Sequence, residues 1–339
     1  MKNHILDILP DELKKYIFSI DEKKYRVKQI LNWIYNNNEL NFSRMTTLPF
    51  EFREKLFNKF SNFLPGIIKK EVSRDGSVKY LLELEDELRI EMVLIPNEKK
   101  NTLCVSSQVG CARECKFCAT AIMGLKRNLK VYEIVAQIFI ILQELKKNKL
   151  TNIVFMGMGE PLDNLQNVIK AIKIIQHNSG FKFSPRRITI STCGIIPKIK
   201  ELTESNLKVK LAVSLNSAIQ EKREELMPMS RQYPLSDLKK SLIDFRKKSS
   251  FRITFEYVLI KNFNTGKEDI KALKSFLGDI SCKLNVIVWN EVDTMPFKAP
   301  SEQEVRNFIE SMQELSSAVT FRKSRGSDIS AACGQLAAE

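Results

Sequence analysis

The spacing of apolar positions divides the chain into three stretches, and the first, residues 1–75, has helical periodicity. Apolar residues within 25–34 recur every three or four positions and therefore share one face of a helix. The segment 49–60 repeats this pattern and carries three cations on its outward positions. The sequence predicts a small helical domain, whose basic face is either a surface for gripping RNA or an ordinary solvated face.

The apolar period changes to two between Val78 and Ile95. Apolar and polar residues alternate on both sides of an acidic turn at 85–87, which is typical of a β-hairpin. We predict that this hairpin, over residues 76–96, links the helical domain to the rest of the chain. Glu91 falls on the face opposite to the apolar positions. From alternation alone, we expect its side chain to face solvent.

Beyond residue 97, apolar β-rich runs alternate with amphipathic helical runs. The expected strands are 103–106, 152–156, 187–190, 209–213, 253–259 and 284–289. The expected helices between them are 131–147, 164–178, 198–205, 235–248 and 267–277. Six such units predict an α/β fold with a parallel sheet or a partial barrel. Parallel strands present their ligands at their C-terminal ends, so we expect the site there.

Composition adds a charge excess and an odd number of cysteines. The 54 Lys and Arg residues against 40 Asp and Glu give a net charge of +14, which favours a polyanionic partner such as nucleic acid. A Lys-rich composition without any binding consequence is the alternative. Seven cysteines without a secretory signal indicate a reducing cytoplasm and working thiols. The longest apolar run, 134–145, is too short to cross a bilayer and is interpreted as a buried helix.

Cys111, Cys115 and Cys118 form a C-x3-C-x2-C pattern after the first core strand. Thiolates this close can bind one metal centre, and three of them leave a [4Fe-4S] cluster one ligand short. The open iron can then chelate S-adenosylmethionine and cleave it to a radical. The alternative is a zinc site, which normally takes four Cys or His ligands. Neither of the two histidines, His4 and His177, stands at ligand spacing from the three cysteines, so the pattern favours the cluster.

Polar or glycine-rich loops follow four of the expected strands. These loops are Gly157–Pro161, Ser191–Gly194, Ser214–Asn216 and Trp289–Asn290. One such loop is usually ordinary, but four behind one cysteine loop predict a cofactor site. Their carboxylate, hydroxyl and amide groups can bind the ammonium, carboxylate and ribose of S-adenosylmethionine. We also expect Gly157 and Gly159 to let the backbone approach the ligand closely.

Two further cysteines stand out from the rest. Cys104 ends the first core strand, seven residues before the three-cysteine loop. Cys333 lies among small residues and follows the basic run 322–325, whose cations would favour the nucleophilic thiolate. For Cys333, chemistry alone supports a functional thiol and an ordinary buried thiol equally. Cys193 and Cys282 are interpreted as buried apolar side chains.

These motifs resemble the RlmN/Cfr family of radical S-adenosylmethionine RNA methyltransferases. The resemblance is carried by 26–35, Cys104–Cys111, the three-cysteine loop, Gly157–Pro161, Ser191–Gly194 and Ala331–Leu336. It implies a partial (βα)6 TIM-like barrel over 97–328, with a small helical N-terminal accessory domain over 1–75, the hairpin linker over 76–96 and a C-terminal segment over 329–339. Pro161 and the N-terminal match favour the RlmN branch, whose product is 2-methyladenosine, over the Cfr branch, whose product is 8-methyladenosine.

The resemblance also implies a role for each matching residue. Cys111, Cys115 and Cys118 would hold the cluster. Cys333 would take a methyl group from one S-adenosylmethionine, and a second molecule at the cluster would yield the radical that activates this methyl group. Cys104 would resolve the protein–RNA adduct, leaving a transient Cys104–Cys333 disulfide for an external reductant. Glu91 matches a proton acceptor. The positions that match cofactor contacts are Gly159, Glu160, Ser191, Ser214, Leu215, Asn216 and Asn290.

The implied substrates are an adenosine of 23S rRNA and the adenosine next to the tRNA anticodon. We further expect a cytoplasmic monomer that does not associate with membranes. Three positions depart from the family pattern: Cys193 replaces a frequent Ser, Asn216 a common His, and Glu291 a frequent Pro. The competing hypotheses are a carbon-8 methyltransferase of the same family and a zinc-containing RNA-binding protein.

Overall fold

One ten-stranded sheet runs through the molecule, in the order β14-β13-β12-β11-β10-β9-β6-β5-β4-β3. The computed structural model describes residues 2–98, 100–145, 149–292, 295–313 and 318–338. The parallel part of the sheet comprises β6 (Lys100–Cys104), β9 (Asn152–Phe155), β10 (Ile188–Thr192), β11 (Lys210–Ser214), β12 (Ile253–Leu259), β13 (Cys282–Val288) and β14 (Ala318–Arg322). The six expected core strands are therefore confirmed, and β14 adds a seventh that the sequence did not reveal.

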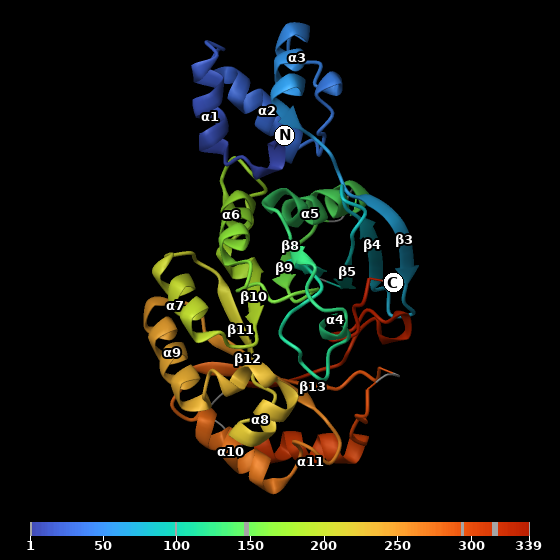
Figure 1. The fold of residues 1–339 in the computed structure, drawn as a ribbon, viewed down its shortest axis with the longest axis vertical. Helices are drawn as coiled ribbons and strands as arrows, with labels where there is room; N and C mark the ends of the chain where they lie inside the picture. Colours follow the sequence, from blue (N-terminus) through green and yellow to red (C-terminus); the bar gives the residue numbers. More distant parts are fainter. Residues whose placement is uncertain (1, 99, 146–148, 293–294, 314–317, 339) are drawn as a thin grey trace.

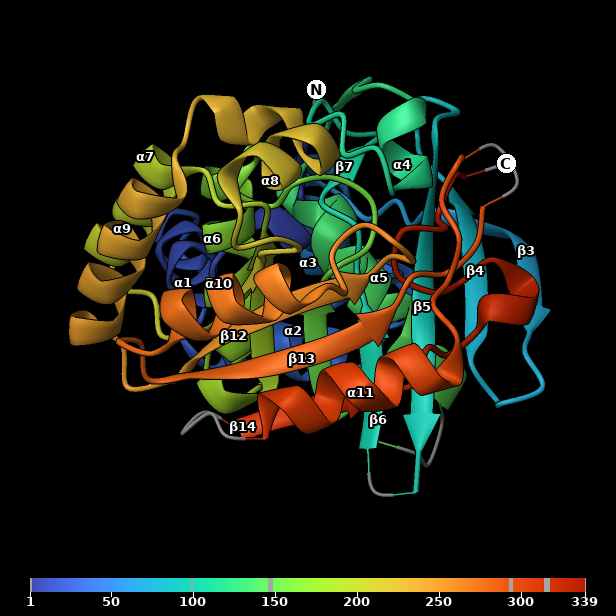
Figure 2. The same ribbon diagram turned by 90° about the horizontal axis from the view of Figure 1, so that it is seen from below.

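Helices cover the outer face of this sheet (Figures 1 and 2). Five of them were expected: α5 (Val131–Leu145), α6 (Leu165–Gln176), α7 (Ile196–Glu204), α9 (Leu235–Lys248) and α10 (Lys267–Leu277). Three were not: α4 (Ala119–Ile122), α8 (Gln220–Leu226) and α11 (Glu302–Met312). Helix α5 is buried along most of its length because it lies between the sheet and the N-terminal domain (Figure 1). No helix in the described ranges is both long and apolar enough to span a bilayer.

The N-terminal domain contains α1 (Pro10–Ser19), α2 (Tyr25–Tyr35) and α3 (Phe50–Lys59), as its periodicity predicted. A short parallel pair, β1 (Asn3–His4) and β2 (Phe60–Ser61), closes it. The prediction of helix up to residue 75 is wrong at its end, because β3 (Gly66–Val72) is a strand. Six of its seven side chains are exposed, as befits an edge strand, so it shows no apolar period.

The expected hairpin is confirmed as β4 (Val78–Glu83) and β5 (Arg89–Asn97), which pair in antiparallel register. It is not an independent linker. Strand β5 pairs with β6 and strand β4 with β3, so the hairpin extends the core sheet as an antiparallel wing. A short antiparallel pair, β7 (Gln108–Val109) and β8 (Arg127–Asn128), flanks the three-cysteine loop. The hairpin therefore continues the sheet beside the first core strand, close to where that loop begins.

His4 joins the N-terminal domain to α5, and its burial leads to a prediction about pH. Its ring stacks on Tyr132 at a centroid distance of 4.2 Å, and its Nδ1 accepts the backbone N–H of Leu6 at 3.0 Å. Its Nε2 must then donate to the carbonyl oxygen of Phe63, 2.7 Å away. These contacts require the neutral ring, and burial lowers the pKa of His4 from 6.5 to about 4.

We expect the free energy of unfolding to fall by about 3 kcal/mol between pH 7 and pH 4 on account of His4 alone. The unfolded chain takes up the proton near pH 6.5, whereas the folded chain resists it down to about pH 4. Acidification across this interval therefore favours the unfolded state. Urea titrations at several pH values check this, and His4→Gln should flatten the dependence. An equally steep dependence in that variant would contradict the assignment.

Candidate metal centre and cofactor cavity

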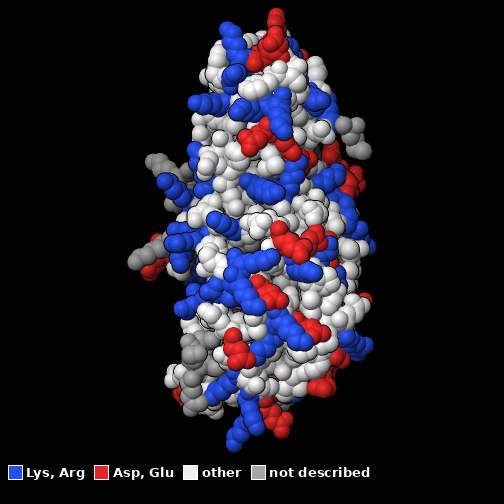
Figure 3. Space-filling model, turned by 90° about the vertical axis from the view of Figure 1, so that its left-hand side faces the viewer, with Lys and Arg blue, Asp and Glu red and all other residues white. Residues whose placement is uncertain are grey.

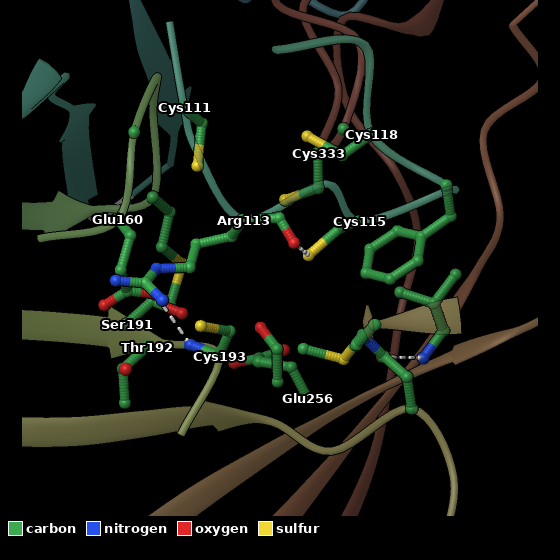
Figure 4. A pocket seen from close by; sticks show the side chains of 18 of the residues that line it. Cys111, Arg113, Cys115, Cys118, Glu160, Ser191, Thr192, Cys193, Glu256 and Cys333 are labelled. Atoms are coloured by element: carbon green, nitrogen blue, oxygen red, sulfur yellow. Dashed lines mark hydrogen bonds between the residues drawn. The ribbon is translucent and has the colours of Figure 1, made fainter. Parts of the chain in front are cut away.

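A cavity of about 160 Å³ opens at the C-terminal ends of the parallel strands. The three-cysteine loop forms one wall, and strand ends from β9 to β13 form the others (Figure 4). Among the residues to which the sequence analysis gave a catalytic, cofactor-binding or metal-binding role, those lining it are Cys111, Cys115, Cys118, Gly159, Glu160, Ser191, Ser214, Asn216, Asn290 and Cys333. Leu215, Cys104 and Glu91 do not line this cavity. The parallel fold thus brings together loops that are far apart in sequence.

The three-cysteine loop is shaped by a glycine and an ion pair. Gly110 has φ +74°, and a Cβ there would lie 1.7 Å from the carbonyl oxygen of Gly124, so only glycine fits. Arg113 forms a two-pronged ion pair with Asp163, in which Nε lies 2.6 Å from Oδ2. Because Asp163 belongs to the loop after β9, this pair fastens the cysteine loop against the opposite wall.

The three thiols fit a cluster better than a single ion. Within the described parts of the chain, no three His, Cys, Asp or Glu side chains surround one ion position. A zinc ion requires every sulfur about 2.3 Å from one point, whereas a four-iron cluster spreads its ligands over separate irons. Burial raises the pKa of all three thiols, that of Cys111 to about 12. Metal binding must therefore displace their protons.

The Glu160 carboxylate is held rigidly at the cavity wall. It accepts the backbone N–H groups of Leu162 at 3.0 Å and Cys193 at 2.8 Å. The backbone N–H of Glu160 donates to the side chain of Gln108 at 2.8 Å. Burial raises the pKa of Glu160, and the accepted hydrogen bonds oppose this rise. A carboxylate with two oxygens already oriented can still accept from an ammonium group in the cavity.

The other expected cofactor contacts differ in how they meet the cavity. Asn216 has φ +56°, which asparagine tolerates, and its side-chain oxygen accepts the N–H of Val258 at 3.1 Å. Asn290 donates to the carbonyl oxygen of Cys333 at 3.1 Å. Leu215 is fully buried and shapes the loop through its backbone. Ser191 and Ser214 line the cavity.

Gly157 and Gly159 both line the cavity, and the expectation that they let the backbone approach the ligand stays a prediction. A Cβ at Gly157 would lie 2.8 Å from Ser106 Oγ, and one at Gly159 would lie 2.5 Å from the Gln108 side chain. The space that these glycines leave open is therefore filled by the chain that follows β6. They allow two loops of the protein to pack closely, and it is this packing that brings Glu160 to the cavity.

Two buried charged residues of this site were missed by the sequence analysis. Arg223 is 1% exposed and donates to the carbonyl oxygens of Cys193 at 2.6 Å and Ser214 at 2.8 Å, which ties together the ends of β10 and β11. Glu256 lies on β12 in register with Ser214 and lines the cavity. One of its oxygens accepts from Asn285 at 3.0 Å, and the other is buried without a hydrogen-bond partner among the described residues. A glutamate within an apolar strand was the signal available for Glu256.

Cys333 also lines a second cavity, of about 30 Å³, together with Cys104 and Arg322. Cys104 is buried, and burial raises its pKa to about 12, whereas Cys333 is an exposed residue. The Arg322 guanidinium acts on both thiols in the direction that lowers the pKa. The cation expected beside Cys333 is therefore present and favours the thiolate, as predicted. Cys193 and Cys282 are buried, as interpreted.

Glu91 lies outside both cavities. The expectation of a solvent-facing side chain is wrong, because Glu91 is only 2% exposed. The C-terminal segment covers its face of the hairpin, and the backbone N–H groups of Ala337 and Ala338 contact its carboxylate. The role of Glu91 as proton acceptor stays a prediction.

Comparisons with known proteins agree over the whole chain. Residues 105–277 match the radical SAM superfamily, and residues 3–61 match the ribosomal RNA large subunit methyltransferase N-terminal domain. The probable dual-specificity RNA methyltransferase RlmN of Dictyoglomus turgidum is 44% identical over 339 residues, covering 99% of this chain and 97% of that protein. The RlmN of Geobacter sulfurreducens is 43% identical, covering 96% and 89%.

The fold is also similar to a solved structure. The crystal structure of a radical SAM methyltransferase from Sphaerobacter thermophilus has a TM-score of 0.95 and 36% identity, covering 99% of this chain and all of that one. The superfamily match includes the three-cysteine loop and implies a [4Fe-4S] cluster and S-adenosylmethionine as cofactors. These findings do not fit a zinc-containing RNA-binding protein. The chain belongs to the RlmN family of radical S-adenosylmethionine RNA methyltransferases.

Proposed function

We propose that this chain methylates carbon 2 of an adenosine in 23S rRNA and of the adenosine next to the tRNA anticodon, with Cys333 as the methyl carrier. The relatives named as dual-specificity RNA methyltransferases and the match of the N-terminal domain support the RlmN product over 8-methyladenosine. The ring carbons of adenine are weak nucleophiles, so radical addition is a reasonable route to their methylation. The proposed setting is the cytoplasm, with the protein as a monomer.

One observation carries this proposal: Cys333 lines both the cavity of the three-cysteine loop and the small cavity of Cys104. A thiol that carries a methyl group must meet the methyl donor, the radical and the resolving thiol in turn. Figure 4 shows Cys333 beside Cys118 at the edge of the larger cavity. We propose that movement of the C-terminal segment presents the sulfur to each partner in turn.

In the first proposed step, the Cys333 sulfur attacks the methyl group of one S-adenosylmethionine. The bond between sulfur and methyl carbon forms as the donor sulfonium bond breaks, and the thiol proton leaves to solvent. Cys111, Cys115 and Cys118 would hold the cluster, which supplies the radical chemistry when a second S-adenosylmethionine is bound. Glu160, Ser191 and Asn290 would orient that second molecule.

In the closing steps, the activated carbon on Cys333 joins the adenine ring and links protein to RNA. This adduct then gives up the proton of the ring carbon and one electron, for which the cluster would be the acceptor. The sulfur of Cys104 then attacks that of Cys333 and breaks the bond between Cys333 and the transferred carbon. The carbon takes up the proton that the Cys104 thiol gives up, so this step leaves a disulfide between the two cysteines and a methyl group on the base. A dithiol reductant from outside the chain must supply two electrons before the next turnover.

The surface supports a large polyanionic substrate. Figure 3 shows Lys and Arg side chains along the full length of one face, interspersed with acidic ones. Four exposed aromatic rings of the N-terminal domain each carry a cation above the ring: Phe18, Tyr25, Phe50 and Phe57. Unpaired bases stack on such surfaces, and cations neutralise phosphates. We propose that this domain binds the RNA.

Nucleoside mass spectrometry tests the proposed function directly. Anaerobically reconstituted protein, labelled S-adenosylmethionine and an RNA fragment should yield labelled 2-methyladenosine. Labelled 8-methyladenosine would instead identify the carbon-8 activity, and unmodified RNA from a fully loaded protein would refute the proposal. Parallel reactions with a 23S rRNA fragment and a tRNA measure the two specificities.

Replacing Cys115 with alanine should remove the cluster. Two thiols do not retain a four-iron centre that already lacks one ligand, so we expect iron to fall from about four atoms per chain to below about one. The brown colour and cleavage of S-adenosylmethionine should disappear with it. Iron analysis and absorbance spectra give the measurement.

Cys282→Ala is the matched control for Cys115→Ala, because Cys282 lines neither cavity. It should keep the wild-type iron content. A Cys115→Ala protein that retained all its iron would remove Cys115 from the ligand set.

A further inference from the structure

Glu91 places both carboxylate oxygens against other parts of the protein. Its Oε1 lies 3.1 Å from Lys79 Nζ, and its Oε2 accepts the backbone N–H groups of Ala337 at 2.9 Å and Ala338 at 3.1 Å. Glu91 is 2% exposed and Lys79 is 9% exposed. One carboxylate oxygen of this buried ion pair therefore holds the chain four and five residues beyond Cys333.

The wing of the sheet forms the surface on which the C-terminal segment lies. Side chains of Lys79, Leu81, Glu91 and Val93 alternate with those that face the core, and all four are buried. Figures 1 and 2 both show the C-terminal segment beside β4 and β5. Docking of this segment explains why a strand face with two charged residues is not exposed.

The same segment is also fastened closer to Cys333 and upstream of it. The carbonyl oxygen of Gly334 accepts the N–H of Ala119 at 2.7 Å, and that of Leu336 accepts the Thr120 hydroxyl at 2.7 Å. Upstream, Asp328 accepts the hydroxyl of Ser73, in the β3–β4 turn, at 2.6 Å. Most of these contacts use the backbone of the segment, so they fix the position of Cys333 relative to the rest of the protein.

The backbone of Ala338 is strained, which indicates that the contact with Glu91 holds it in place. Ala338 has φ +54°, in the left-handed region that non-glycine residues rarely adopt. Such a conformation persists only where surrounding contacts hold it. The hydrogen bond from the Ala338 N–H to Glu91 is such a contact, and it is accepted by a charged group, which makes it stronger.

We propose that Glu91, supported by Lys79, docks the C-terminal segment and thereby positions Cys333 at the mouth of the two cavities. Glu91 is on this view a positioning residue, and its carboxylate becomes free for any other partner only when residues 337–338 lift away. The inference rests on the proposed methyl-carrying role of Cys333. It differs from a proton-acceptor role, because it acts before RNA has bound.

Hydrogen exchange tests the docking without any cofactor. Glu91→Ala should accelerate exchange of the Ala337 and Ala338 amides by about tenfold or more, because it removes two hydrogen bonds to a charged acceptor. Glu91→Gln retains an acceptor oxygen and should restore part of the protection. Glu83→Ala, which removes a carboxylate from an exposed ion pair of the same hairpin, is the matched control and should change neither amide.

Mass spectrometry of Cys333 tests the positioning. With S-adenosylmethionine but no RNA, Glu91→Ala should slow Cys333 methylation by about the factor that undocks the segment. A chain ending at Leu336 lacks both amides and should be slowed equally, with or without Glu91→Ala, because the two changes remove one contact. This truncation also serves where Glu91→Ala fails to fold.

The outcomes separate the possible roles. Unchanged amide exchange in Glu91→Ala would overturn the docking, and faster exchange with normal Cys333 methylation would overturn the positioning. If the effects of the truncation and of Glu91→Ala on Cys333 methylation were additive, the two changes would not act through the same contact. Absence of Cys333 methylation in the wild-type protein would instead refute the proposed function, while the exchange data would still decide whether Glu91 docks the segment.

Discussion

Cys333→Ala is expected to abolish RNA methylation, by at least about a thousandfold, as loss of a covalent nucleophile does. The proposed route passes every transferred methyl group through the Cys333 sulfur, and within the described ranges no other thiol lines both cavities. Cys193 also lines the larger cavity, but its backbone is fixed to Glu160 at 2.8 Å. It is therefore not placed to replace the methyl carrier.

The Cys333→Ala protein should retain its cluster, because the residue is not among the three proposed ligands. Iron content and brown colour are therefore the controls that separate a lost methyl carrier from a lost cofactor. In the wild-type protein, the tryptic peptide that begins at Gly326 should gain the mass of one methyl group when S-adenosylmethionine is supplied. Methylated RNA from Cys333→Ala would show that the methyl group takes another route.

Much of the fold was predictable because its core elements bury one face each. Helices α9 and α10 begin and end where the apolar period predicted, at 235–248 and 267–277. Strands β3 and β14 were not predicted because they are the two edges of the sheet. Most of their side chains are exposed, so no apolar alternation marks them in the sequence.

The site was predictable where its residues act through local motifs and unpredictable where they act through distant packing. The cysteine loop and the strand-end loops each appear as short patterns, and the parallel sheet brings them together. The burial of Glu91 depends on Ala337 and Ala338, about 246 residues away in sequence. Arg223 binds carbonyl groups, which every residue carries, so no sequence pattern identifies its partners.

The net effect of competing influences was also beyond the sequence. The basic run before Cys333 does supply a cation, Arg322, to both reactive thiols. Burial is nevertheless the larger influence on the pKa of Cys104, and its direction is opposite, whereas Cys333 is an exposed residue. Which influence prevails at each thiol depends on the packing around it, and that packing joins segments far apart in sequence.

Cys104→Ala is expected to trap the protein covalently on its RNA substrate. The Cys104 sulfur shares a cavity of about 30 Å³ with Cys333, where it can break the bond between Cys333 and the transferred carbon. Without it the linked intermediate has no resolving thiol, so most of the active protein should migrate with RNA on a denaturing gel after one turnover. Removing one buried sulfur costs stability of about 1 kcal/mol, which leaves the protein folded.

The covalent adduct predicted for Cys104→Ala joins RNA to the Cys333 sulfur, so a double variant provides the control. Cys104→Ala combined with Cys333→Ala should form no adduct, because the RNA would have no sulfur to join. Ribonuclease digestion of the adduct should leave one modified nucleotide on the tryptic peptide that begins at Gly326. Free turnover of Cys104→Ala without any adduct would mean that another group cleaves the bond to Cys333, since the geometry offers Cys104 as the thiol that shares the small cavity with it.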